Sequence, residues 1–457
     1  MSQGFKPYDR DQLYLLPPSL RDWLPPGDLA YFIIDVVESL DLSGIYRHYE
    51  VALTAAGVRG KAASGQPPFH PKVMVSLLLY AYALGTPSSR KIARLCERDS
   101  GYRVVSANQQ PNFRTIAEFR RLHLQALHGL FVQVLHLARE AGLVKLGHVA
   151  LDGTKVKANA SKHKAMSYAR LVEKEAQYVR EVAALLAQAQ ETDAAEDRAH
   201  GKDVRGDELP EELRFRATRL AKIREAKQAL EEAAKEQARA EGKLDAHDQP
   251  LPPARGKAPK TPPGTPAPKA QRNFTDPESR IMKMGDGAFD QAYNCQAAVD
   301  AAHQIIVAQE ATAAANDKQQ VVPLVKQIQK NLRQMPQQAS ADSGYYSEAN
   351  VRYLRRKHID DYVCPDRLKH GQAPPPVRGP IPKGLAFIDR VRRKLLTQKG
   401  RLTYALRKQI VEPVFGQLKH VRGLRQFLLR GRAKVQGEWS LWCTTHNLLK
   451  MWCATAG

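Results

Sequence analysis

The chain has few cysteines and no long apolar run, and each absence excludes a class of protein. Its 457 residues include only Cys96, Cys295, Cys364, Cys443 and Cys453, with no Cys-x-x-Cys pair. Such scattered cysteines exclude a disulfide-stabilised scaffold and fit a reducing compartment. No apolar segment reaches the ~20 residues of a membrane-spanning helix, and the first residues lack the apolar region of a signal peptide. We therefore expect a cytoplasmic protein that does not use a membrane.

Acidic residues are scarce relative to basic ones. The chain has 70 Lys and Arg against 47 Asp and Glu, a formal net charge of +23. A protein this basic is typically a partner of a polyanion, most often nucleic acid, and a merely solubilising surface is the alternative. From Val351 onward the sequence has 23 Lys and Arg against 6 Asp and Glu. This local excess indicates a binding face in the last quarter of the chain.

Residues 1–145 have the pattern of short helices separated by proline and serine. Pro71 stands where a helix begins, a position at which its missing N–H costs little. Arginines occur near the starts of the following helices, at Arg90 and Arg114. This pattern suits a helix-turn-helix DNA-binding domain and equally a plain helical packing domain.

Strand-like segments begin after residue 145. An apolar run ends at Asp152-Gly153, a typical turn dipeptide, and alternation from Thr154 indicates a second short strand or an extension of the first. Residues 166–245 then predict two long charged helices, either a coiled-coil hairpin or a solvated insertion. Residues 246–284 are a Pro/Lys-rich linker and re-entry segment with no packable face in its proline-rich part.

Residues 285–457 resume the strand and helix pattern. Strands at 292–300 and 305–312 predict a hairpin, a helix is expected from Asp317, and a further strand ends at Asp342-Ser-Gly. Together with residues 146–165, this order predicts a mixed α/β sheet with helices on its faces, interrupted by the helical insertion.

Three carboxylates are candidates for metal-dependent chemistry: Asp152, Asp342 and Glu412. Two of them end predicted strands, and Glu412 lies on a helix that could pack against that sheet edge. Cleavage of a phosphodiester with divalent metal needs hard oxygen ligands on a rigid frame, and strand ends supply such positions. Taken singly, each aspartate is also an ordinary turn residue and the glutamate an ordinary partner of surface cations.

The segment from Tyr404 through Arg407, Lys408 and Glu412 to Lys419 resembles the tyrosine–arginine–glutamate–lysine signature of DDE transposases from bacterial insertion sequences. The resemblance extends to Ala-Leu-Asp-Gly-Thr-Lys-Val-Lys-Ala-Asn around the first acid and Ala-Asp-Ser-Gly-Tyr-Tyr-Ser around the second. Matching segments occur between about residue 70 and residue 450, which is most of the chain.

The resemblance implies an RNase H-like catalytic domain and a DNA transposase. Such an enzyme cleaves element ends and transfers the freed 3′-hydroxyl to target DNA. Asp152, Asp342 and Glu412 would bind Mg²⁺, with Mn²⁺ as the alternative, and Tyr404, Arg407 and Lys419 would contact DNA near the cut. The implied partners are double-stranded element ends and target DNA, bound by a homodimer or larger assembly in the bacterial nucleoid.

One spacing departs from the family signature. Four residues separate Arg407 from Glu412 where the signature has three, and Lys408 has the three-residue spacing. At about 100° per residue, Lys408 and Lys419 project near the Glu412 face of a helix and Arg407 projects away from it. Lys408 is therefore a second candidate for the arginine's role, and Pro413 predicts a local helix break after the acid.

Two other functions share these features. A nuclease on the same fold would cut DNA without rejoining it, and both reactions would use the same carboxylates. A non-catalytic DNA-binding protein derived from a transposase would be expected to lack at least one acid, and here all three are present.

Overall fold

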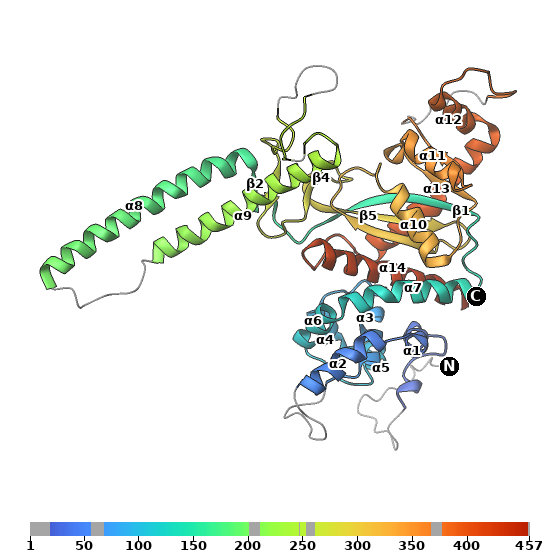
Figure 1. Ribbon diagram of the computed structural model, residues 1–457. Helices are drawn as coiled ribbons and strands as arrows, with labels where there is room; N and C mark the ends of the chain where they lie inside the picture. The colour runs from blue at the N-terminus through green and yellow to red at the C-terminus, as the bar shows by residue number, and fades with distance from the viewer. Residues whose placement is uncertain are drawn as a thin grey trace, which may run out of the picture.

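The computed structural model describes residues 19–55, 68–200, 211–245, 247–252, 261–366 and 377–455 (Figure 1). A helical N-terminal part packs beneath a mixed sheet, and a pair of long helices projects to one side. Within these ranges, none of the helices combines the length and apolar character required to cross a membrane.

The N-terminal part is helical, and helix α3 (Pro71–Ala83) is its most deeply buried element. Its sequence is apolar on nearly every face, so it can be surrounded by other elements. Pro71 occupies the first turn, as the sequence predicts. Whether one of these helices enters a DNA groove stays a prediction. The other helices of this part are α1 (Leu29–Ser39), α2 (Ser43–Ala55), α4 (Ser89–Arg98), α5 (Ser100–Val105), α6 (Phe113–Leu122) and α7 (Leu124–Glu140).

The described strands include a six-stranded mixed sheet, which confirms the α/β expectation. Its order is β4-β5-β1-β7-β8, and β6 also pairs with β5. β5 runs antiparallel to β1, β4 and β6, forming the predicted hairpin with β6, while β7 and β8 run parallel to β1 and to each other. The strands are β1 (His148–Lys157), β4 (Arg280–Lys283), β5 (Phe289–Asp300), β6 (Ile306–Thr312), β7 (Gln338–Ala341) and β8 (Asp360–Val363).

The structure corrects the expected end of the first strand. Asp152 lies inside β1, paired with Ala297, and Gly153 is paired with Gln296, so Asp-Gly is not a turn here. The alternation from Thr154 is an extension of the same strand. The long partner β5 continues the ladder past this dipeptide, and this tertiary pairing outweighs the local turn preference.

The remaining helices pack around the sheet. α14 lies between the sheet and the N-terminal helices and contacts β6 as well as α7 and α3 (Figure 1). Buried apolar side chains consequently form one continuous core from the N-terminal helices to the sheet. The helix expected from Asp317 begins four residues later. These helices are α10 (Val321–Leu332), α11 (Glu348–Arg356), α12 (Phe387–Leu396), α13 (Gln398–Gly416) and α14 (Arg432–Thr455).

The charged insertion forms two long helices, α8 (Tyr168–His200) and α9 (Glu211–Ala240), which pack antiparallel with a small apolar core of their own. Residues 201–210, between the two helices, lie outside the described residues. At the base of the pair, β2 (Ala165–Ser167) pairs with β3 (Gln271–Asn273).

β3 and β4 show that the last part of the segment 246–284 is not a structureless linker. Both strands are short, and they form because β3 pairs with β2 and β4 pairs with β5. Residues 246 and 253–260 lie outside the described residues.

Candidate active site

The register between β1 and β7 places Asp152 and Asp342 side by side. The two strands are parallel, and Leu151 pairs with Ala341, the last residue of β7. Asp152 and Asp342 are the next residues of the two strands, so their side chains start from backbone positions roughly 5 Å apart. Asp152 Oδ1 accepts the N–H of Gly153 at 2.8 Å, and Asp342 Oδ1 accepts the N–H two residues further on at 2.9 Å. The two predicted aspartates therefore converge at one edge of the sheet.

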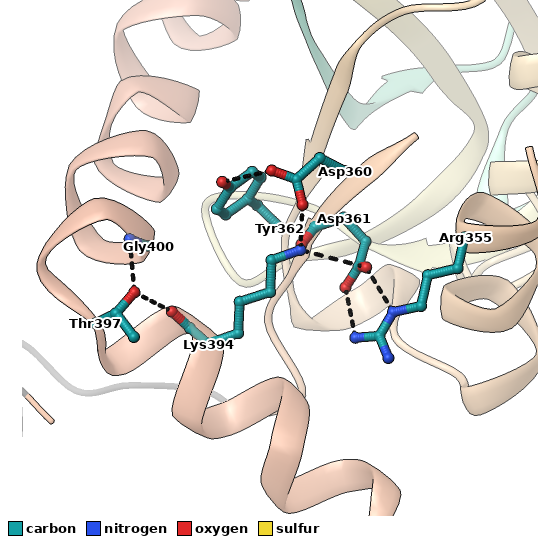
Figure 2. A network of polar contacts seen from close by, with 7 residues as sticks. All are labelled: Arg355, Asp360, Asp361, Tyr362, Lys394, Thr397 and Gly400. Atoms are coloured by element: carbon teal, nitrogen blue, oxygen red, sulfur yellow. Dashed lines mark hydrogen bonds and ion pairs between the residues drawn. The ribbon is translucent and has the colours of Figure 1, made fainter. Parts of the chain in front are cut away.

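A network of charged groups joins α12 and α11 to the edge strand β8 (Figure 2). Lys394 of α12 donates to Asp360 Oδ1 at 2.6 Å and pairs with Asp361 Oδ1 at 3.3 Å. Arg355 of α11 pairs with the same Asp361 at 2.8 Å. Because Asp361 is buried, the two cations offset the cost of removing its charge from water. This network fixes the position from which α13 starts.

Helix α13 packs against the sheet, and the side chain of Glu412 on this helix is exposed. The helix begins after Thr397, whose hydroxyl accepts the N–H of Gly400 at 3.0 Å, and it contacts β8, β7, β5 and β1. Pro413 does not end the helix as predicted, because α13 continues to Gly416. It then passes into a π-helical turn, Gln417–Val421.

Arg407 faces the acids, and Lys408 is exposed. Arg407 Nη1 lies 3.1 Å from Asp152 Oδ2, and the charges of Asp342 and Glu412 also act on this guanidinium. The spacing along an isolated helix places Arg407 away from Glu412, but this spacing does not say which side of α13 packs on the sheet. The side of α13 that packs on the sheet decides which residue meets the strand-borne acids, and that side carries Arg407.

The electrostatic environment of Asp152 favours an added positive charge. Burial raises the pKa of its carboxyl to about 6, opposed by Arg407 and by the N–H of Gly153. The neighbouring carboxylates of Asp342 and Asp317 raise it further. Burial also disfavours the charge of Arg407, yet the surrounding acids raise the pKa of Arg407 overall. A buried acid with this profile, beside other acids, is typical of functional sites.

Tyr404 and Lys419, two predicted DNA contacts, are half-buried. Burial raises the pKa of Tyr404, and its ring lies 5.8 Å from the guanidinium of Arg407. Lys419 Nζ donates to the backbone carbonyl of Lys155 in β1 at 2.8 Å, and burial lowers the pKa of Lys419. Both side chains therefore lie against the site and not on an open surface.

Asp317 is a fourth acid of this region that the sequence did not single out. It lies in the turn before α10, and its Oδ1 accepts hydrogen bonds from Asn294 Nδ2 and Gln296 Nε2, each at 2.7 Å. The usable signal was in β5, where Asn294 and Gln296 are two residues apart and therefore share one face of the strand. Buried amides require polar partners, so their presence there predicts a polar group packed against that face.

Comparison with family models gives two matches. The model described as "Transposase DDE domain" matches residues 244–448, and the model described as "Transposase domain (DUF772)" matches residues 18–122. The first range contains Asp342 and the whole of α13, whereas Asp152 lies before it. No curated protein and no solved structure matched the chain.

Proposed function

The chain belongs to the DDE transposases, a class typical of bacterial insertion sequences, and from this premise we propose which residues perform its reaction. The protein is a DNA transposase whose catalytic domain is RNase H-like. We assign the catalytic carboxylates to Asp152, Asp342 and Glu412. The parallel register that makes Asp152 the neighbour of Asp342 supports the assignment most strongly, because Asp152 lies outside the matched range.

The reaction consists of two phosphoryl transfers. In the first, water attacks phosphorus at the element end, the P–O3′ bond breaks, and a 3′-hydroxyl and a 5′-phosphate are left. In the second, the oxygen of that 3′-hydroxyl attacks a target phosphodiester. A new P–O bond forms, and a target 3′-hydroxyl leaves with the proton. Both steps develop negative charge at phosphorus that the site must stabilise.

We propose Mg²⁺ as the cofactor, with Mn²⁺ as the alternative, held by Asp152 and Asp342 with Glu412 as a third ligand. Adjacent carboxylates are the hard oxygen donors these ions prefer. Burial, and then the charges of Asp342 and Asp317, raise the pKa of Asp152, and a bound cation would offset both effects. When bound, the cation supplies electrostatic stabilisation of the reacting phosphate. In the part of the chain that the structure describes, no three His, Cys, Asp or Glu side chains are close enough to hold a metal ion. In the structure, the positive charge beside Asp152 is the guanidinium of Arg407.

Near the cut, we propose that Lys408 contacts a DNA phosphate directly, because it is exposed on α13. Arg407 is buried against Asp152, and we infer that it orients that acid while Tyr404 packs beside it. Lys419 is fixed to β1, and its charge adds to the positive potential of the site's DNA side.

A second proposed DNA contact lies on α11 and α12. Arg352, Arg356 and Arg390 line an open cavity of about 950 Å³ with Phe387, whose ring centroid lies 4.5 Å from the Arg352 guanidinium. Guanidinium groups suit phosphate oxygens in geometry and charge. We propose that the arginines that line this cavity contact the phosphate backbone of element-end or target DNA in the nucleoid. Because two ends must be joined, we propose at least a homodimer in the DNA complex.

The test is cleavage and joining of a labelled element-end duplex by Asp152→Asn, Asp342→Asn and Glu412→Gln. Each substitution should abolish both products while leaving duplex binding largely intact, because the fold and the basic surface are unchanged. Glu140→Gln, which removes an exposed acid on α7, is the matched control and should retain activity. Retained cleavage by any of the three variants contradicts the assignment of that residue.

A further inference from the structure

Two glycines follow the sheet-borne acids, and the backbone does not require glycine at either position. Gly153 comes directly after Asp152, and Gly344 comes two residues after Asp342. Neither is among the residues with positive φ. Gly153 is inside a strand, where glycine weakens pairing and often marks a close approach by another group. The reason for these glycines must therefore be sought in the space beside them.

The same carboxylate lies over both glycines. A Cβ added at Gly153 would stand 3.1 Å from Asp317 Oδ1, and one added at Gly344 would stand 3.2 Å from Asp317 Oδ2. The second Cβ would also stand 3.0 Å from Asp342 Oδ1. Asp317 thus lies against the backbone of β1 just after the first catalytic acid and beside the carboxylate of the second. The atom nearest to a Cβ at Gly153 would be Nε2 of Gln296, the amide that donates to Asp317, so a side chain there would displace this amide together with Asp317. A side chain at Gly344 would displace the carboxylates of Asp342 and Asp317.

Buried polar groups fix the orientation of Asp317. Its Oδ1 accepts hydrogen bonds from Nδ2 of Asn294 and Nε2 of Gln296, and the side-chain oxygen Oε1 of Gln296 accepts one from the hydroxyl of Tyr345. Tyr345 follows Asp342 by three residues and is fully buried. The network therefore connects the turn after β7 to the middle of β5 and leaves Asp317 Oδ2 directed toward Gly344.

A second observation at this place points to a ligand. Asn294 has a relative exposure of 0%, and its Nδ2 donates to Asp317 and to the carbonyl of Ala314 at 3.1 Å. These two acceptors determine the orientation of the amide, so Asn294 Oδ1 faces Gly153, 3.0 Å from where a Cβ would be. Among the described residues this buried oxygen has no hydrogen-bond donor. An oxygen in this state, beside acids, suits a cation or its bound water.

We propose that Asp317 is a fourth carboxylate of the active site, a positioning residue whose charge, next to Asp152 and Asp342, raises the affinity of the site for a divalent cation. The proposal rests on the proposed function. Without a cation, Asp317 adds repulsion to the site. With a cation, it adds attraction and keeps the strand-borne acids oriented toward the ion. Asp317 packs over both glycines, with Gln296 Nε2 at Gly153 and Asp342 Oδ1 at Gly344, and these groups leave no room for a side chain at either position.

Asp317→Asn separates this role from a structural one. An asparagine oxygen can still accept both amide N–H groups, so the network is kept while the charge is lost. We expect Mn²⁺ affinity, measured by electron paramagnetic resonance on the full-length protein, to fall roughly 10- to 100-fold. The melting temperature of the metal-free protein should stay the same or rise, because a repulsive charge is removed. Unchanged Mn²⁺ affinity, with or without a lower melting temperature, would overturn the proposal.

Two comparisons keep this test separate from the proposed function. Asp342→Asn should lose Mn²⁺ binding altogether, and if it binds normally the metal-site assignment itself fails, whatever Asp317→Asn does. Gly344→Ala should weaken Mn²⁺ binding, because the added Cβ would press on the carboxylates of both Asp342 and Asp317. Gly129→Ala on α7, where the added Cβ meets nothing within 4 Å, should not change it. Equal Mn²⁺ affinity in the two alanine variants would also overturn the proposal.

Discussion

The two parts of the candidate site are positioned by different means. Asp152 lies in β1 and Asp342 directly follows the parallel strand β7, and the backbone register Leu151–Ala341 fixes their separation. Glu412 and Arg407 stand on α13, whose position depends on side-chain packing and on the charged network that joins α12 to β8. Backbone hydrogen bonds between paired strands determine which residue lies opposite which. A helix that packs on a sheet can rotate or shift by a fraction of a turn.

This difference explains why Asp152 and Asp342 lie side by side while Glu412 is exposed. The pairing of β1 with β5 and β7 needs no ligand, because backbone hydrogen bonds to both neighbours hold it in register. The helix-borne groups are held by fewer constraints, and Arg407 supplies the charge that pairs with Asp152. The comparison can be tested by changing one part and asking whether the other responds.

The largest expected effect comes from removing the link between the two parts. Arg407→Ala leaves the half-buried carboxylate of Asp152 without its cation, which should cost about 3 kcal/mol in unfolding free energy, the lower end of the range for a buried pair. We expect cleavage to fall roughly 10- to 100-fold as well, the usual effect of removing a group that orients a metal ligand. Lys408→Ala, the matched control on the same helix, should lose far less and show a shallower salt dependence of DNA binding. If the two variants lost equal cleavage rate, Arg407 would not be the residue of α13 that faces Asp152.

A pH effect confined to the sheet part is expected next. Burial raises the pKa of Asp152 to about 6, against roughly 3.9 in an unfolded chain. The folded state therefore keeps a proton that the unfolded state has lost between these values. The raised pKa of Asp152 therefore leaves the unfolding free energy highest below pH 4. This free energy falls by up to about 3 kcal/mol as the pH rises through 6.

Urea unfolding of the metal-free protein between pH 4 and pH 7 measures this effect. Glu438, whose pKa burial raises to about 7, shifts stability in the same direction. The informative quantity is therefore the difference between wild type and Asp152→Asn. That difference should grow as the pH rises, in favour of the variant, and a difference independent of pH would refute the raised pKa.

A smaller effect is expected where α12 meets β8. Lys394→Ala removes one of the two cations beside buried Asp361 and leaves Arg355 in place. We expect a loss of about 1–2 kcal/mol in unfolding free energy, since the remaining cation still pairs with the carboxylate. Cleavage should fall several-fold because the start of α13 is less well fixed. Lys408→Ala again serves as control, and a variant with full cleavage would show that this network does not position the helix.

The smallest effect is expected in the projecting helix pair. Glu175 pairs with Arg224 at 3.1 Å and with Lys227 at 2.8 Å, and these groups remain partly exposed. Glu175→Gln should cost less than about 1 kcal/mol in thermal unfolding, because exposed pairs contribute little. Cleavage should be unchanged. A large loss of cleavage would assign the helix pair a role in the active complex beyond stability.

Much of the architecture could be predicted from sequence because its signals are local. The apolar segment of α3, the short strand-like runs of β5 and β6, and the charged helices of the insertion are each recognisable from their own residues. The acids Asp152, Asp342 and Glu412 were candidates for a related reason: their residue types and flanking motifs are visible without knowing what they contact.

Sequence alone determined the composition of the site and the class of chemistry it suits: carboxylates for a divalent cation and a basic surface for DNA. Only the tertiary structure decided that Asp152 lies inside its strand, that Arg407 and not Lys408 faces it, and that Asp317 fills the space over two glycines. These facts depend on contacts between segments far apart in the chain. Pairing with β5, docking of α13 and the approach of the turn before α10 are set by the whole fold, and no local pattern records them.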